Sequence, residues 1–165
     1  MKGFFFRSLM MNTIIHEYGT FSYLTFSVSE TPEGKERIDK LFSLLQGKTD
    51  YEVAKLLFNS EDEKELLSLS GLDIFYHDKI KLTSVDKFTL NLKWHTFYSA
   101  PIGIFQELVN RDPDLLIDGF VERTFYDGEN DISVQGGLVM GGSTKYWHDE
   151  ITPEEQHFLD KIKAT

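Results

Sequence analysis

Four residues near the end of the chain are of types that could bind a metal ion and support hydrolysis: His148, Asp149, Glu150 and His157. Imidazole and carboxylate groups are common zinc ligands, and a bound metal ion activates water for attack on a substrate. The two histidines do not have the HExxH spacing, which places both on one face of a helix. A small metal-dependent hydrolase is therefore only the second interpretation of this sequence, and no metal site is expected.

Two other segments resemble ligand sites, and each lacks a residue that the chemistry requires. Segment 136–143 is rich in glycine like a phosphate-binding loop, but Gly142 stands where that loop needs a lysine. Asp127, Glu129 and Asp131 alternate like calcium ligands, yet an EF-hand needs flanking helices and a glutamate at its twelfth position. The first segment favours a strand and the second a hairpin turn, so no cofactor is expected.

The remaining histidines, His16, His77 and His95, form no recognisable catalytic pair. His95 falls on the polar face of a predicted strand, near His77 if the two strands pair. The chain has no Gly-x-Ser-x-Gly motif and no cysteine, which excludes thiol nucleophiles, thiolate zinc sites and disulfides. We therefore assign no catalytic residues and expect that the protein is not an enzyme.

The charge of the chain is strongly acidic and unevenly distributed. The net charge is −10; residues 1–101 hold 14 acidic and 12 basic residues, whereas residues 102–165 hold 13 acidic and 5 basic residues. An acidic field repels phosphate backbones, which argues against direct nucleic-acid binding and favours a partner with a basic surface. The alternative is that the acidity serves only solubility.

Aromatic residues beside these acids suggest where such a partner could bind. Tyr146 and Trp147 precede a run of charged residues, and aromatic side chains rimmed by charge are common interface anchors. They are equally common as lids that close the edge of a core. The predicted binding surface consists of Asp127, Glu129, Asp131, Tyr146, Trp147, Asp149 and Glu150.

The first half of the chain predicts one strand and three helices. Residues 21–28 are rich in aromatic and β-branched types, which favour a strand. Thr31 and the proline after it predict the start of a helix that ends at Gly47. Residues 49–70 predict two short helices, and Ser60–Glu63 has the pattern of a capping box.

The second half predicts mainly strands. Apolar and polar residues alternate over 87–97, as in a strand with one buried face. Asp112 and Pro113 predict the end of a helix, because the residue before proline is pushed out of the helical region. The other predicted elements are short strands near 75–77 and 80–82, a helix from Ser99–Pro101, strands over 115–126 and 132–140, and a helix over 152–163.

This order predicts a single α+β domain over residues 1–165. Two strand–helix passes over one antiparallel sheet, with helices on one face, are typical of the ferredoxin-like (split βαβ) fold. Residues 49–70 would then be a helical insertion, and residues 152–163 a C-terminal helix.

Three segments of the chain resemble the YubB-like family, small ferredoxin-like proteins of phages and plasmids. They are the turn and helix start at 92–101, the helix stop at Asp112–Leu115, and the opening strand at 23–28. The family's Trp-Cys-x-x-x-Trp-Gly segment is replaced here by Phe75–Asp78 and its neighbours. The resemblance implies a ferredoxin-like fold and a mobile-element origin, and it supplies no catalytic residues.

These observations favour a non-enzymatic acidic protein of phage or plasmid origin that binds the basic surface of a host protein. A nucleic-acid-binding defence or replication factor is the kind of partner expected, with the chain acting as an inhibitor or DNA mimic. Arg7 interrupts the apolar N-terminal run and no stretch approaches the roughly 20 apolar residues of a membrane span, so a cytoplasmic protein is expected. A structural module that oligomerises through an edge strand is a further alternative.

Overall fold

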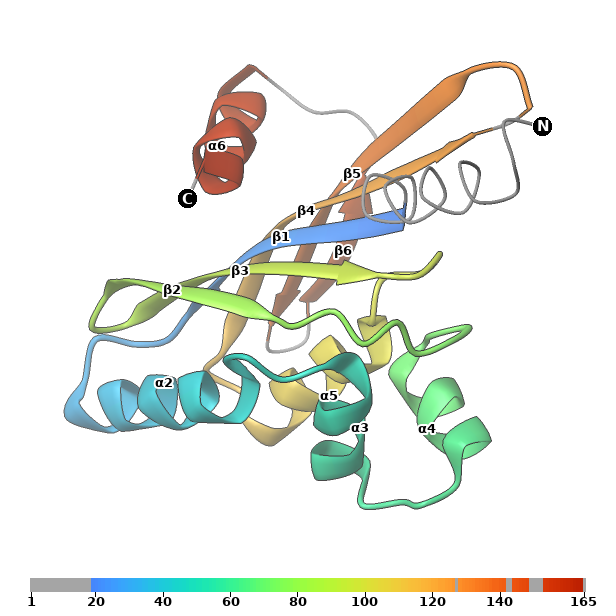
Figure 1. The fold of residues 1–165 in the computed structure, drawn as a ribbon. Helices are drawn as coiled ribbons and strands as arrows, with labels where there is room; N and C mark the ends of the chain where they lie inside the picture. Colours follow the sequence, from blue (N-terminus) through green and yellow to red (C-terminus); the bar gives the residue numbers. More distant parts are fainter. Residues whose placement is uncertain (1–18, 127, 142–143, 149–152, 165) are drawn as a thin grey trace.

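The protein has an α+β fold built on one antiparallel sheet, as the computed structural model shows (Figure 1). The structure describes residues 19–126, 128–141, 144–148 and 153–164. The strands are β1 (Gly19–Ser27), β2 (Lys81–Asp86), β3 (Thr89–Thr96), β4 (Leu116–Tyr126), β5 (Asp131–Gly141) and β6 (Thr144–His148), and the helices are α2 (Pro32–Leu45), α3 (Asp50–Phe58), α4 (Glu63–Ser70), α5 (Ile102–Arg111) and α6 (Pro153–Ala164).

The six strands lie in the order β2-β3-β1-β4-β5-β6, and every neighbouring pair is antiparallel. The predicted α+β class is therefore confirmed. The six-stranded order is not that of a classic ferredoxin-like sheet, because β5, which corresponds to the predicted strand 132–140, and β6 continue the sheet beyond β4.

The alternating pattern of β1 and β3 decides which side of the sheet is buried. Every second residue of both strands is buried, and the two strands pair directly with Phe26 opposite Leu90 and Leu24 opposite Leu92. Because side chains alternate between faces along a strand, one apolar row forms the inner face and one mainly polar row forms the outer face. The expectation that these two strands share a sheet is confirmed.

Helices α2 to α5 cover the inner face and complete the core (Figure 1). The largest fully buried side chains are Trp94, Phe26 and Phe105, and the ring of Phe105 packs edge-on against both others. Helix α6 lies on the opposite side of the sheet and contacts β1, so the expectation of helices on one face only is wrong for this helix.

Side-chain caps begin α2, α3 and α4, and the sequence indicated only the first of them, Thr31. The hydroxyl of Thr31 accepts a hydrogen bond from the Gly34 N–H at the start of α2, and Thr49 forms a capping box with Glu52 at the start of α3. The capping box predicted at Ser60–Glu63 is wrong. Asp62 is the N-cap of α4, because its carboxylate stands one residue before the helix and accepts from the free N–H groups there.

A strand predicted near residues 75–77 is a loop, and the predicted strand list lacked β6. The N–H groups of Tyr76 and His77 donate to the buried carboxylate of Asp50, so they cannot join a strand ladder. His77 also has a left-handed backbone, with φ of 71°. Within the described residues, no helix combines the length and the apolar character needed to cross a bilayer.

Candidate functional site

The end of the sheet at which β3 stops and β1 starts carries a set of polar and aromatic contacts. Thr20 of β1 pairs with Thr96 of β3 and with Arg123 of β4. The β4–β5 hairpin continues past this point and projects beyond the helices (Figure 1). We call this region the hairpin end.

A histidine and a carboxylate form a largely buried contact at the hairpin end. His95 Nδ1 lies 2.7 Å from Asp78 Oδ2, and the His95 side chain is 9% exposed. The His95 ring stacks on Phe21, with centroids 4.2 Å apart and planes 7° apart, and the Tyr76 ring meets it edge-on at 4.7 Å. The carboxylate and the two rings fix the orientation of the imidazole. His95 is therefore a packed side chain with defined neighbours and not a solvated surface histidine.

Asp50, the first residue of α3, holds the loop that carries Asp78 and so positions this pair. Its side chain is buried, with 1% of the residue exposed, and its oxygens accept hydrogen bonds from Tyr76 N at 2.8 Å and His77 N at 3.3 Å. A carboxylate at the N-terminus of a helix is also stabilised by the helix dipole. The loop held in this way directs the side chains of Tyr76 and Asp78 toward His95.

Two tyrosines near this pair remain protonated over the physiological pH range. Burial, followed by the charge of Glu122, raises the pKa of Tyr23 to about 12. Burial, followed by the charge of Asp78, also raises the pKa of Tyr76. Both phenols are therefore hydrogen-bond donors at neutral pH rather than nucleophiles or bases.

An arginine lies between two aromatic rings on the other side of the hairpin end. The Arg123 guanidinium carbon is 5.9 Å from the centre of the Tyr98 ring and 5.3 Å from that of Phe125. Tyr98 has a left-handed backbone with φ of 63°, its carbonyl accepts a hydrogen bond from the Thr20 hydroxyl, and it is 51% exposed. Contact with the two rings fixes the orientation of the Arg123 side chain, and arginines of this kind are common anchors of protein–protein interfaces.

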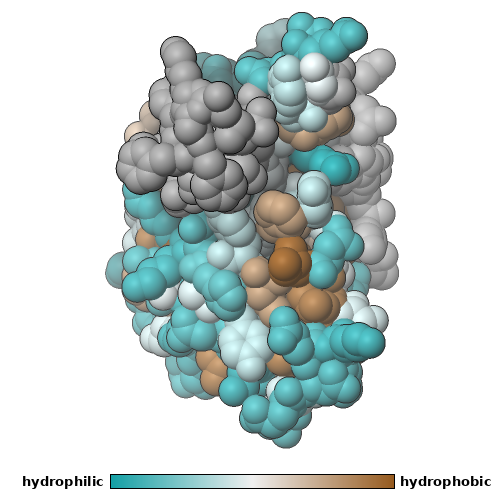
Figure 2. Space-filling model, turned by 45° about the vertical axis from the view of Figure 1, so that its right-hand side comes forward, coloured by the Kyte–Doolittle hydropathy of each residue, from teal (hydrophilic) through white to brown (hydrophobic). Residues whose placement is uncertain are grey.

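The tip of the hairpin combines acidic with apolar groups. Tyr126 is 58% exposed and its hydroxyl donates to the Gly128 carbonyl at 3.0 Å; Val134 is 50% exposed. Glu129 and Asp131 are also exposed. Figure 2 shows a hydrophobic patch surrounded by hydrophilic residues at mid-height of the molecule, below the level of the hairpin tip.

The structure separates the residues of the predicted binding surface into two groups. Glu129 and Asp131 lie at the hairpin tip, whereas Tyr146 and Trp147 lie in β6 opposite Val139 and Leu138. Tyr146 is thus about 26 Å along the sheet from the tip, at roughly 3.3 Å per residue. Asp127, Asp149 and Glu150 lie outside the described residues.

Of the four residues proposed for metal binding, His148 and His157 lie in described elements, and Asp149 and Glu150 lie outside the described residues. His148 is the last residue of β6, and His157 is an exposed residue of α6. Across residues 19–126, 128–141, 144–148 and 153–164, no group of three or more His, Asp or Glu residues could hold a metal ion.

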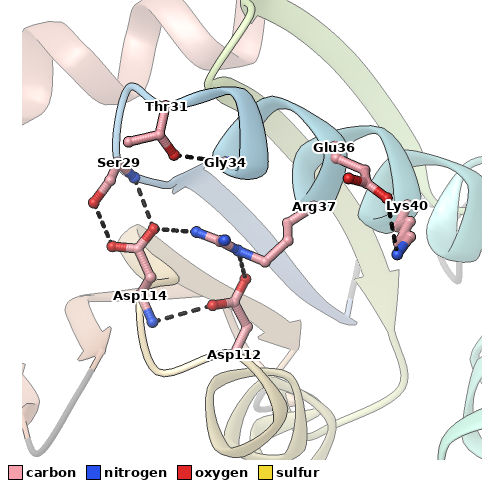
Figure 3. Close-up of polar contacts among 8 residues, drawn as sticks. All are labelled: Ser29, Thr31, Gly34, Glu36, Arg37, Lys40, Asp112 and Asp114. Atoms are coloured by element: carbon pink, nitrogen blue, oxygen red, sulfur yellow. Dashed lines mark hydrogen bonds and ion pairs between the residues drawn. The ribbon is translucent and has the colours of Figure 1, made fainter.

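Two acidic residues of the second half of the chain, Asp112 and Asp114, form a polar cluster with Arg37 and Ser29 at the opposite end of the sheet (Figure 3). Arg37 Nε donates to Asp112 at 3.0 Å and Arg37 Nη2 to Asp114 at 2.5 Å. The Ser29 hydroxyl and N–H also donate to Asp114, and these bonds, followed by Arg37, lower the pKa of that carboxyl. The cluster ties the start of α2 to the turn between α5 and β4, which is a structural role.

Comparisons with known proteins give no assignment: no family model matches the sequence, and no curated protein or solved structure is significantly similar to it. The resemblance to the YubB-like family therefore stays a prediction.

Proposed function

We propose that this protein is a non-enzymatic interaction protein that binds a basic surface of a partner protein through its hairpin end. The observation that carries this proposal is the projecting β4–β5 hairpin, on which Tyr126 and Val134 are exposed and Arg123 is held between aromatic rings. Interfaces commonly use such aromatic and arginine anchors at their centre and polar residues at their rim.

The charge of the hairpin end supports a basic partner. Of the described residues, Asp73, Asp78, Glu122, Glu129 and Asp131 belong to this end, together with the cations Arg123 and Lys79. The excess of carboxylates creates a negative potential that attracts a basic surface and increases the association rate. Such attraction weakens as salt screens the charges.

We further propose that β1 to β4 with α2 and α5 form a ferredoxin-like unit. The chain order strand, helix, two strands, helix, strand and the spatial order β4-β1-β3-β2 support it. Together with the resemblance to phage and plasmid proteins, this supports a host protein as the partner, of the nucleic-acid-binding defence or replication type.

The experiment is capture of the partner, followed by measurement of its affinity as a purified protein. The double variant Glu129→Lys and Asp131→Lys should weaken binding at least tenfold at low salt. The matched control, Glu30→Lys and Glu33→Lys, makes the same change in net charge at exposed positions at the opposite end of the sheet. Equal affinities of the two double variants, or binding that does not respond to salt, would contradict the proposal.

A further inference from the structure

The edge of the sheet formed by β2 is blocked against further strands. The N–H of Leu82 donates to Gln46 Oε1 at 2.7 Å instead of joining a strand ladder. The N–H of Ile80, just before β2, donates to the Lys48 carbonyl at 2.8 Å. The pairing of β2 with β3 also shifts register after Ser84. Covering groups and bulges of this kind prevent an edge strand from pairing with other chains.

The opposite edge of the sheet has an open part. β6 pairs with residues 137–141 of β5, whereas residues 132–136 pair with β4 in regular register and, among the described residues, with no strand on their other side. This segment belongs to the projecting hairpin (Figure 1). Every second residue of an antiparallel strand directs its N–H and C=O to the same side, so this segment also presents backbone groups away from β4. It contains no lysine, proline or bulge, and we call it the open edge.

One face of the sheet beside the open edge is mainly apolar. Residues directly opposite each other on paired strands share a face. Ile132 lies opposite Phe125, and Val134 lies opposite Arg123, whose guanidinium contacts the Phe125 ring. Val134 is 50% exposed, so a strand added here would cover apolar surface on this face.

The other face beside the open edge is polar and acidic. Ser133 is exposed, and the side-chain amide of Gln135 donates to the carboxylate of Glu122 on β4. The amide is neutral, so this contact leaves the charge of Glu122 in place. Residues 116–141, which include β4 and β5, hold five acidic residues and one basic residue.

An extended segment in which apolar and basic residues alternate matches both faces. Its apolar side chains would continue the row of Ile132 and Val134, and its basic side chains would lie on the face of Glu122. A second copy of the chain matches less well, because it carries a net charge of −10 and would place like charges side by side. Segments that add to a sheet edge gain affinity from main-chain hydrogen bonds and specificity from alternate side chains.

We propose that the partner contributes an extended segment of alternating apolar and basic residues, which adds to β5 as a further strand at the open edge. This inference rests on the function proposed above, because it specifies how a basic partner is recognised at the hairpin end. It adds the requirement that the partner's main chain pairs with residues 132–136.

The test compares two capped hexapeptides of equal composition on the full chain, Lys-Val-Lys-Val-Lys-Val and Lys-Lys-Lys-Val-Val-Val. The alternating peptide should bind at least tenfold more tightly and should slow amide exchange at every second residue of the open edge. Methylation of its alternate backbone nitrogens should abolish binding. Equal affinities of the two peptides would overturn strand addition and leave electrostatic attraction, and thus the proposed function, intact. No binding of the alternating peptide, or protection confined to other segments, would also overturn the inference.

A matched pair of lysine variants tests the position of the added strand. Ser133→Lys should weaken binding of the alternating peptide about tenfold, because it places a lysine on the face that receives the basic side chains. Ser84→Lys makes the same change at an exposed position of β2 and should change the Kd less than about twofold. Equal effects of the two variants would refute the placement. A dimer of the unmodified chain that Ser133→Lys dissociates would show that a second copy fills the open edge, and would overturn the inference.

Discussion

The substitution Asp50→Ala, which removes the carboxylate, should destabilise the fold and release the loop that holds Asp78 against His95. Asp50 is 1% exposed and accepts hydrogen bonds from the N–H groups of Tyr51 and Tyr76, both at 2.8 Å, and from that of His77 at 3.3 Å. Each buried donor left without a partner costs about 1–3 kcal/mol.

The N–H of Tyr51 can be hydrated at the start of the helix, so we count only the two loop donors. Asp50→Ala should therefore lower the free energy of unfolding by about 3 kcal/mol. With a urea m value of about 2 kcal/mol/M, the midpoint should fall by about 1.5 M at unchanged m. Amide exchange of Tyr76 and His77 should accelerate by more than the global change in stability requires.

Asp73→Ala is the matched control in the same loop. The Asp73 carboxylate is exposed and accepts one hydrogen bond, from the Ser99 hydroxyl at 3.1 Å, so its loss should cost less than about 0.5 kcal/mol. If Asp50→Ala changed the stability no more than Asp73→Ala does, the role given to the buried carboxylate would be refuted.

Three other predictions concern ionisation and packing. The folded state lowers the pKa of Asp114. The ionised carboxylate therefore stabilises the fold above the ordinary pKa of 3.8, and this effect is lost as the pH falls through the folded value. Asp114→Asn should reduce stability at neutral pH and have no effect in strong acid. The folded state raises the pKa of Tyr23 from 10.0 to about 12. The contribution of the neutral phenol to the free energy of unfolding is therefore complete below pH 10 and is lost as the pH rises through the folded value. Tyr23→Phe should make the fall in stability at alkaline pH smaller, as measured by unfolding at several pH values together with ultraviolet titration of the tyrosines. A Cβ atom on Gly103 would lie 1.8 Å from the carbonyl oxygen of Leu69, so Gly103→Ala should cost at least about 3 kcal/mol, whereas Gly47→Ala, strained only by its φ of 70°, should cost about 1 kcal/mol in thermal unfolding.

Much of the fold follows from local patterns in the sequence. The alternation of apolar and polar residues in β1 and β3 is visible without a structure, since a strand with one buried face has a period of two. Thr31 with the following proline, and the Asp112–Pro113 stop, mark helix ends by short-range stereochemistry. Both kinds of signal depend on neighbours within a few positions.

The features that the sequence did not predict depend on distant residues. Nothing near Asp50 in the sequence indicates that its partners are the N–H groups of Tyr76 and His77. The contact of Asp78 with His95 likewise requires the loop and β3 to be placed first. The contact of Arg123 with Tyr98 depends on the left-handed backbone of Tyr98, and a tyrosine does not predict this conformation because the conformation favours glycine.

The central position of β1 sets the order in which this sheet can be assembled. Among the described residues β1 precedes every other strand, yet its two neighbours are β3 and β4, of which β4 follows α5. During synthesis the apolar row of β1 must therefore stay without its second neighbour until most of the protein has left the ribosome. Pairings between distant segments slow folding, because chain entropy is lost before the contacts form. Any fragment that ends before β4 leaves one side of the central strand open to pairing with other chains.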